Sequence, residues 1–303
     1  MIYRREFLTG LGAATLAAAA PAQAPLSPRV NPRLKGVGLS SYSLRDAMRW
    51  RYGERTDGEL TMEGFFDYAA REGLDAVEPT SYFFPAPPPA GFVAQLRRRA
   101  HLLGLDISSA AMGNDFSWPP GSDRGQANLA YAREWIERFA DLGAPALRVF
   151  ASRRPPEGLD DDTLVDNVTA NVAEVLPLAE RCGVMLGLEN HDRVRDPDLL
   201  LRIIEQVGSP WLGVCWDSGN LVDTPAPYDH LRRLAPVAAI AQLKTETPVN
   251  GEPMPADYPR LARLLVESGY AGYLVLEYEG EQPPREAIPR HVAELRRAIA
   301  AIG

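Results

Sequence analysis

From Lys35 onward, short apolar runs alternate with longer stretches in which apolar residues recur at helical spacing. Such alternation is typical of parallel strands joined by crossover helices. The apolar runs predict eight strands: Gly36–Ser41, Ala76–Glu78, Asp106–Ala111, Ala146–Phe150, Val184–Glu189, Leu212–Trp216, Ala238–Lys244 and Gly272–Glu277. The amphipathic stretches predict eight helices: Glu59–Arg71, Gly91–Leu103, Ala127–Leu142, Thr163–Cys182, Asp198–Val207, Tyr228–Leu234, Tyr258–Ser268 and Arg285–Ala301.

Glycines mark the returns from helix to strand. Glycine readily adopts the left-handed conformation in which many helices end. Six stand between a predicted helix and the next strand: Gly73, Gly104, Gly143, Gly183, Gly208 and Gly269. Eight strand–helix units fit a closed barrel, and the absence of G-x-G-x-x-G after the first strand argues against a dinucleotide-binding sheet. We expect an α/β protein with a single (β/α)₈ TIM barrel over residues 35–303.

The first 24 residues follow another pattern. Arg4 and Arg5 precede an apolar run, residues 11–20, and a small-residue site, Ala22-Gln23-Ala24. The run is too short to span a bilayer, and the order matches a signal peptide. Arg-Arg-x-Phe-Leu resembles a twin-arginine export signal. We therefore expect a signal peptide over 1–24, a linker over 25–34, a periplasmic location and no membrane attachment after cleavage. An ordinary N-terminal helix is the alternative.

Composition and charge narrow the partners. Apolar residues make up 46% and charged residues 24% of the 303 residues, as in ordinary globular proteins. The net charge of −8 argues against nucleic acid as a partner, since the phosphate backbone binds positively charged surfaces. Cys182 and Cys215 are too few for a disulfide framework and are expected to be buried. A homo-oligomer stays possible.

Polar side chains end four consecutive predicted strands. Glu189 and Glu277 end strands five and eight, Asp217 directly follows strand six, and Gln242 lies in strand seven. The C-terminal ends of barrel strands form the active-site rim, so these groups should meet there. Carboxylates this close repel unless a cation joins them. Three carboxylates and an amide favour Mg²⁺ or Mn²⁺, with Zn²⁺ or Co²⁺ possible. Taken singly, each acid could instead be a helix N-cap or a loop residue.

The motifs around these residues resemble a known family. They are Leu188-Glu189-Asn190-His191, Trp216-Asp217-Ser218-Gly219-Asn220, Gln242-Leu243-Lys244 and Leu276-Glu277-Tyr278-Glu279-Gly280, with Glu78 ending strand two. They are similar to the xylose isomerase-like family of sugar isomerases and epimerases, which includes hydroxypyruvate isomerases, inosose dehydratases and endonuclease IV. The resemblance extends from Lys35 to Ile299. It implies one metal ion held by four residues: Glu189, Asp217, Gln242 and Glu277.

Two positions depart from the epimerases of that family. Those enzymes usually carry histidine on strand seven, where this chain has Gln242, as hydroxypyruvate isomerases do. They also tend to carry histidine three residues after the strand-six aspartate, where this chain has Asn220. Ligation by Gln242 is therefore less firmly implied than ligation by the three acids. The substrate contacts are expected to differ from those of the epimerases.

The resemblance also implies the chemistry. A metal ion polarises a carbonyl and a neighbouring hydroxyl, and the family uses the equivalents of Glu189 and Glu277 as an acid–base pair. We expect an isomerase or epimerase that forms an enediolate of an unphosphorylated sugar or keto-sugar. A lyase or hydrolase of keto-glycosides and a non-catalytic sugar-binding barrel are the alternatives. The DNA-repair branch is disfavoured by the acidic charge and by only four histidines.

Five further residues are candidates for substrate binding: Glu78, Arg148, His191, Asn220 and Lys244. Lys244 shares a strand face with Gln242, so it could stabilise a substrate oxyanion, or else pair with Glu78 or Glu246. Arg148 lies inside strand four, where an unpaired charge is costly, so we expect it to pair with a carboxylate at the rim. Substrate choice is expected to depend on the loops at 41–55, 82–89 and 114–123.

Overall fold

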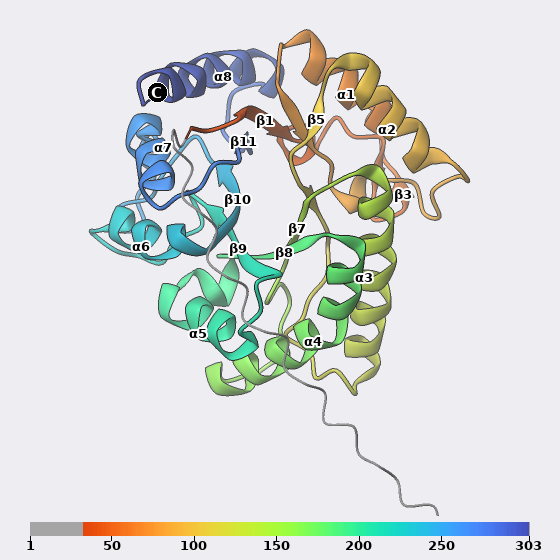
Figure 1. Ribbon diagram of the computed structural model, residues 1–303, viewed down its shortest axis with the longest axis vertical. Helices are drawn as coiled ribbons and strands as arrows, with labels where there is room; N and C mark the ends of the chain where they lie inside the picture. The colour runs from red at the N-terminus through yellow and green to blue at the C-terminus, as the bar shows by residue number, and fades with distance from the viewer. Residues whose placement is uncertain (1–32, 303) are drawn as a thin grey trace, which may run out of the picture.

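A ring of helices surrounds a ring of parallel strands in the computed structural model, which describes residues 33–302 (Figure 1). The predicted signal peptide and residues 25–32 of the predicted linker lie outside the described residues. The strands are β1 (Gly36–Ser40), β2 (Trp50–Arg51), β3 (Glu54–Arg55), β4 (Ala76–Glu78), β5 (Asp106–Ile107), β6 (Ala110–Ala111), β7 (Ala146–Val149), β8 (Met185–Glu189), β9 (Leu212–Asp217), β10 (Ala238–Leu243) and β11 (Tyr273–Leu276).

The helices follow the strands in alternation. The α-helices are α1 (Met62–Arg71), α2 (Phe92–Leu103), α3 (Asp123–Leu142), α4 (Asp161–Cys182), α5 (Pro197–Val207), α6 (Pro227–Leu234), α7 (Tyr258–Glu267) and α8 (Pro284–Ala300). Short 3₁₀ helices are η1 (Ser41–Leu44), η2 (Ser81–Phe83), η3 (Asp192–Arg195) and η4 (Ala235–Val237). No helix within residues 33–302 combines the length and the apolar character that crossing a bilayer requires.

The barrel closes through the third predicted strand. The sheet order is β5-β4-β1-β11-β10-β9-β8-β7-β6, and all of its pairs are parallel. β5 pairs with β4 and β6 pairs with β7, so these two short strands are the halves of the run predicted as Asp106–Ala111. Ala111 pairs with Arg148 of β7 and also forms a parallel bridge with Thr80, so this run joins the two edges of the sheet. The single (β/α)₈ barrel is confirmed.

Capping residues determine where the helices begin and end. Thr61, Ser122 and Asp160 each accept a backbone N–H three residues further on, so α1 begins later, and α3 and α4 earlier, than predicted. At the other end, the six predicted glycines all have positive φ. Gly104, for example, caps α2 with φ 70° and donates its N–H to Ala100 and His101. These caps return each helix to the barrel at a defined point.

The strands are buried on both faces, as expected of a barrel strand. One continuous apolar core fills the space between strands and helices and includes Phe65, Phe66 and Phe139. A small second sheet, the antiparallel β2–β3 hairpin, was not predicted. Its turn residues, Tyr52 and Gly53, have φ of 53° and 84°. This hairpin brings Tyr52 to the rim of the barrel, where its ring lies 4.9 Å from that of Tyr82.

Candidate active site

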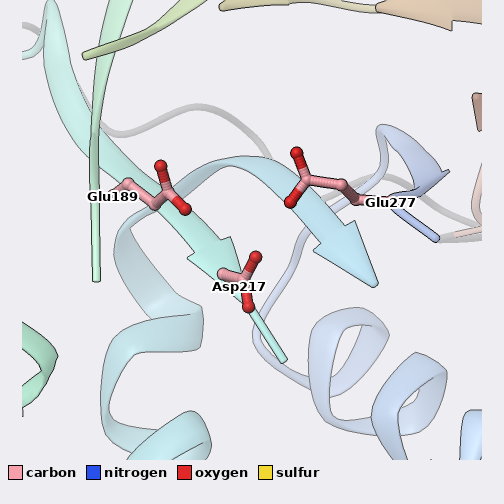
Figure 2. A group of neighbouring side chains, drawn as sticks. All are labelled: Glu189, Asp217 and Glu277. Carbon is pink, nitrogen blue, oxygen red and sulfur yellow. The ribbon is translucent and has the colours of Figure 1, made fainter. Parts of the chain in front are cut away.

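Three carboxylates converge at the C-terminal rim of the barrel. Glu189 ends β8, Asp217 ends β9 and Glu277 directly follows β11. One carboxylate oxygen from each lies within 4.8 Å of the others, and all three side chains are buried. The carboxylates of Glu189 and Glu277 face each other, and that of Asp217 lies between and below them (Figure 2). The structure therefore confirms that the three predicted acids meet.

Backbone N–H groups fix the Asp217 carboxylate. Its Oδ1 accepts the N–H of Gly219 at 2.8 Å and that of Asn220 at 2.9 Å. Asn190 holds the backbone of this turn, because its amide accepts the N–H of Asp217 and donates to the carbonyls of Asp217 and Asn220. The other carboxylate oxygen, Oδ2, is buried without a hydrogen bond. That oxygen is the one left to bind a cation.

Glu189 is held from two sides. Asn220 Nδ2 donates to Oε1 at 2.9 Å, and Arg148 Nε lies 3.1 Å from Oε2. The arginine contact is an ion pair without a well-directed hydrogen bond. Both atoms are buried, and neither makes a hydrogen bond of good geometry. Arg148 also donates to the Met112 carbonyl at 3.1 Å. The predicted pairing of Arg148 with a rim carboxylate is confirmed, and Asn220 positions that same carboxylate.

Lys244 balances the opposite side of the triad. Its ammonium donates to Glu277, donates to Glu279 Oε2 at 2.6 Å and lies 3.5 Å from Asp217 Oδ2. The predicted alternative, an ion pair with Glu78 or Glu246, is wrong. The physical reason is the position of Lys244 directly after β10, where the carboxylates of Asp217, Glu277 and Glu279 surround its ammonium. Glu279 was not singled out in the sequence.

Burial and charge set the proton affinities of the triad. Burial raises the pKa of Glu189 to about 7, although Arg148 opposes that rise. Burial likewise raises the pKa of Asp217 to about 7, against the effect of Lys244. Burial also acts to raise the pKa of Glu277, but Lys244 and Arg148 outweigh it and hold that pKa below its usual value. The two facing glutamates therefore differ in their readiness to hold a proton.

Gln242 is fully buried in the barrel next to Asp217, its partner in the strand register. Its Nε2 donates to Glu78 Oε1 at 2.6 Å, and its Oε1 accepts the thiol of Cys215 at 3.2 Å. Ser109 donates to the other oxygen of Glu78 at 2.6 Å. Burial raises the pKa of Glu78. Gln242 and Glu78 thus form a buried hydrogen-bonded pair beside the triad, and ligation of a metal by Gln242 stays a prediction.

A cavity of about 200 Å³ opens beside the triad. Glu189, Glu277 and the predicted candidates Arg148, His191, Asn220 and Lys244 line it. The remaining lining residues are Tyr42, Tyr52, Tyr82, Phe150, Arg153 and Glu279. Glu78 is fully buried and is not part of this wall. Most of the second group come from loops, where no periodic pattern signals their position.

His191 lies at the edge of the cavity. Its ring packs edge-on against Phe150 with centroids 4.9 Å apart, and its Nδ1 is 2.9 Å from Asp192 Oδ2. Burial lowers the pKa of His191, although Asp192 opposes this. A neutral imidazole beside the cavity can accept or donate one hydrogen bond to a ligand. Phe150 keeps the ring on that wall.

The residues present fit a divalent cation. Glu189 Oε2 and Asp217 Oδ2 are buried oxygens without a hydrogen bond, and a buried polar atom of this kind normally has a partner. With Glu277, they supply hard oxygen ligands from three strands. An ion there would be held by Glu189, Asp217 and Glu277. It would compensate the buried negative charges whose burial, together with their mutual repulsion, raises the first two pKa values.

Comparison with protein families gives a match over most of the chain. A family model described as xylose isomerase-like TIM barrel matches residues 66–298. A solved 3-keto-D-glucoside 4-epimerase from E. coli superposes with a TM-score of 0.67 at 17% identity, covering 88% of this chain and all of that one. At this identity, the likeness shows the fold alone.

Two curated relatives carry names of enzymes. A 3-oxo-isoapionate decarboxylase of Pectobacterium atrosepticum is 26% identical over 186 residues, 61% of this chain and 59% of that protein. The alpha subunit of a 3'-dehydrocarminate deglycosidase from Microbacterium is 31% identical over 137 residues, 43% of this chain and 35% of that protein. The matches thus span 59% and 35% of these relatives' lengths.

Proposed function

The chain belongs to the xylose isomerase-like TIM barrel family, and from this membership we propose that it is a metal-dependent enzyme acting on an unphosphorylated sugar or keto-sugar. The family and the names of the two relatives support an assignment among sugar-modifying enzymes. We propose isomerase or epimerase chemistry through an enediolate of the substrate. The observation that carries this proposal is the pair of facing glutamates, Glu189 and Glu277, on either side of Asp217.

The proposed reaction needs one base and one acid. Glu277 is held ionised by Lys244, so it takes the proton from the carbon beside the carbonyl. The C–H electrons form the C=C bond of the enediolate while the carbonyl π electrons move onto the oxygen. Glu189 then returns a proton to the opposite face of the same carbon, which re-forms the carbonyl and gives an epimer. When Glu189 instead returns the proton to the former carbonyl carbon, the hydroxyl proton of the first carbon passes to the former carbonyl oxygen and an isomer results. A bound Mg²⁺ or Mn²⁺ would supply the electron withdrawal that acidifies this C–H bond. Pairs of carboxyls with opposed pKa shifts are typical of acid–base catalysis.

Elimination is the second candidate, and the name of the deglycosidase relative favours it. A 3-oxo-isoapionate decarboxylase and a 3'-dehydrocarminate deglycosidase both act on compounds named as oxo or dehydro sugars. In a 3-oxo glycoside, removal of the C2 proton makes the C1 substituent a β-leaving group. The C2–H bond breaks, the C1=C2 bond forms, and the C1–O bond breaks to release an alcohol that takes up a proton. The same base serves both outcomes.

Solvent deuterium distinguishes the two outcomes. The protein, loaded with Mg²⁺ or Mn²⁺, is incubated with methyl 3-oxo-β-D-glucopyranoside in D₂O, and the mixture is followed by NMR. Deuterium at C2 or C4 of recovered keto-sugar supports the isomerase or epimerase, and methanol release supports the lyase. Glu277→Gln should abolish either signal, whereas Glu281→Gln, an exposed neighbour, should leave it unchanged. Binding of the sugar with neither signal would support the sugar-binding alternative and overturn the catalytic proposal.

We propose that the protein is exported to the periplasm. The support is the twin-arginine-like sequence at Arg4 and Arg5 with its apolar run and small-residue site. Such export moves folded proteins, so the metal would be loaded before translocation. Residues 1–24 fused to a reporter should direct it out of the cytoplasm, and Lys replacements at both arginines should retain it. Export of the double variant would contradict a twin-arginine route.

A further inference from the structure

Arg153 stands in the wall of the cavity without a carboxylate partner. It follows β7 and Phe150 in sequence and lines the same 200 Å³ cavity as Glu189 and Glu277. Its guanidinium lies 5.0 Å from the ring centroid of Tyr52, 5.8 Å from that of Tyr82 and 5.6 Å from that of Phe150. Three rings therefore surround a half-buried cation.

The other cations of the cavity are already neutralised. Arg148 pairs with Glu189, and Lys244 pairs with Glu277 and Glu279. Within residues 33–302, no carboxylate oxygen lies within 4 Å of the Arg153 nitrogens. Its hydrogen bonds go to the Tyr52 hydroxyl and, at 3.5 Å, to the Gly113 carbonyl. Both acceptors are neutral, so the positive charge of Arg153 is available to pair with an anionic group of a ligand.

The position of Arg153 suits one end of a small ligand. The Phe150 ring contacts both guanidiniums, that of Arg148 at 4.0 Å and that of Arg153 at 5.6 Å. Arg148 in turn touches the triad through Glu189. A single aromatic ring thus separates Arg153 from the cation that pairs with the triad. A sugar whose carbonyl lies at Glu189 and Glu277 would place its far end near Arg153.

We propose that Arg153 binds a carboxylate of the substrate, so that the natural substrate is a keto-sugar acid. This inference rests on the proposed function. Arginine binds carboxylates through two parallel N–H groups, and the rings of Tyr52, Tyr82 and Phe150 lie close enough to hold the guanidinium in place. The single positive charge of Arg153 matches the single negative charge of a carboxylate. A phosphate would call for more donors, such as a helix N-terminus, than this wall offers among the described residues.

The negative net charge of the protein makes a cation at the cavity useful for binding an anionic substrate. The net charge is −8, and the cavity itself carries three buried acids. An anionic sugar approaching this surface is repelled unless a local cation attracts it. Arg153 supplies that attraction at the mouth, while neutral sugars of the same shape gain nothing from it. Arg153 would therefore determine specificity rather than take part in proton transfer.

A matched pair of substrates tests the proposal. Methyl 3-oxo-β-D-glucopyranoside and the corresponding 3-oxo-glucuronide differ only in a hydroxymethyl or a carboxylate at C6. The wild-type protein should prefer the acid in kcat/KM. Arg153→Met should lower the acid-to-neutral ratio of kcat/KM by about 10- to 100-fold, mainly through KM, because a hydrogen bond to a charged group is lost. Arg153→Lys should retain part of the preference.

Arg154→Met is the control, since Arg154 is exposed and lies outside the cavity wall. It should leave the ratio unchanged. An equal preference of the wild-type protein for both sugars, or an equal loss for both in Arg153→Met, would overturn the inference and leave the proposed function standing. A preference for the 6-phosphate over the carboxylate would overturn the choice of anion. Calorimetric binding of the glucuronide that depends on Arg153, without turnover of either sugar, would support the inference and contradict the proposed function.

Discussion

The cavity has two unlike sides. The acidic side is formed by Glu189 and Glu277, which line the cavity, together with Asp217, which completes the triad beside it. These acids lie at the ends of β8, β11 and β9, within the second half of the barrel. The aromatic side is formed by Tyr42, Tyr52, Tyr82 and Phe150, from η1, the β2–β3 turn, η2 and the end of β7. The first side is attached directly to strands. The second is mostly attached to short connecting segments.

This difference separates chemistry from recognition. Strand ends are fixed by the hydrogen bonds of the barrel, so the acidic side holds its oxygens within 4.8 Å of one another. Connecting segments vary freely without disturbing the core, so the aromatic side can change with the substrate. Changes on the acidic side should therefore abolish metal binding and turnover. Changes on the aromatic side should shift substrate affinity.

Asp217→Asn should have the largest effect. The substitution keeps the acceptor for Gly219 and Asn220 but replaces the buried Oδ2 by an amide nitrogen, which cannot bind a cation. We expect loss of bound metal and a fall in kcat/KM on the order of 10³-fold. Metal content measured by mass spectrometry and turnover of the keto-sugar check this. Asp223→Asn, an exposed acid nearby, is the control, and full metal content in Asp217→Asn would refute the triad as the site.

Arg148→Met tests whether the acidic side depends on its buried counter-ion. Removing one partner of a buried ion pair leaves the other charge without compensation, so the free energy of unfolding should fall by about 3–5 kcal/mol in metal-free protein. Bound metal should reduce that loss, because it also neutralises Glu189. Arg133→Met breaks the exposed pair with Glu174 and should change stability by less than about 1 kcal/mol. Equal effects in urea unfolding would count against a special role for Arg148.

The pH dependence of the free energy of unfolding should reveal the cost of ionising the buried acids Glu189 and Asp217. The pKa values of Glu189 and Asp217 are raised to about 7 in the folded protein, from 4.5 and 3.8. The folded state therefore binds more protons than the unfolded state, and the stability this provides is complete below about pH 4 and lost as pH rises through 7. Glu277, whose pKa is lowered, acts oppositely and only below its usual pKa.

Metal-free protein should thus be less stable at about pH 8 than at about pH 5.5, by on the order of 2–4 kcal/mol. Denaturant unfolding after chelation measures the difference. With Mg²⁺ or Mn²⁺ bound, the carboxylates are neutralised by the ion, so the trend should vanish or reverse. If the free energy of unfolding of metal-free protein did not change from pH 5.5 to 8, the pKa values of Glu189 and Asp217 would not be raised in the folded state.

Much of the acidic side was predictable from sequence. Glu189 and Asp217 end apolar runs that can only be buried strands, and parallel strands bring their ends to one rim. Arg148 was predictable too, since a charge inside such a run requires a partner. The glycine after each of six helices located the returns to the barrel. These inferences rest on two local patterns, buried apolar runs that end in a polar residue and glycines that follow helices.

The remaining features depend on contacts that no local pattern encodes. Gln242 bonds to Glu78 across the barrel, 164 residues away, and Lys244 turns to Glu279 rather than to the predicted partners. Tyr52 reaches the rim through a two-residue turn inside a segment rich in charged residues, where neither a strand nor a helix period is visible. Arg153 is one arginine among many until Phe150 and Tyr82 surround it. Such positions follow from the fold alone.

Tyr52→Gly should have the smallest effect and should confine it to the aromatic side. Tyr52 has φ 53°, a conformation that a tyrosine adopts at a cost of about 1 kcal/mol and that glycine adopts freely. Its side chain is 51% exposed, so little buried area is lost, and the greater freedom of unfolded glycine offsets the relief of strain. Stability should stay within about 1 kcal/mol of wild type.

Substrate affinity should respond differently, because the ring stacks on Tyr82 and its hydroxyl accepts from Arg153. Losing one aromatic contact should raise KM about fivefold, with kcat and metal content unchanged. Asn250→Gly makes the same backbone change at φ 50° outside the cavity wall and should leave KM unaltered. If Tyr52→Gly instead lowered metal content, the two sides of the cavity would be coupled. The strained turn would then support the chemistry as well as recognition.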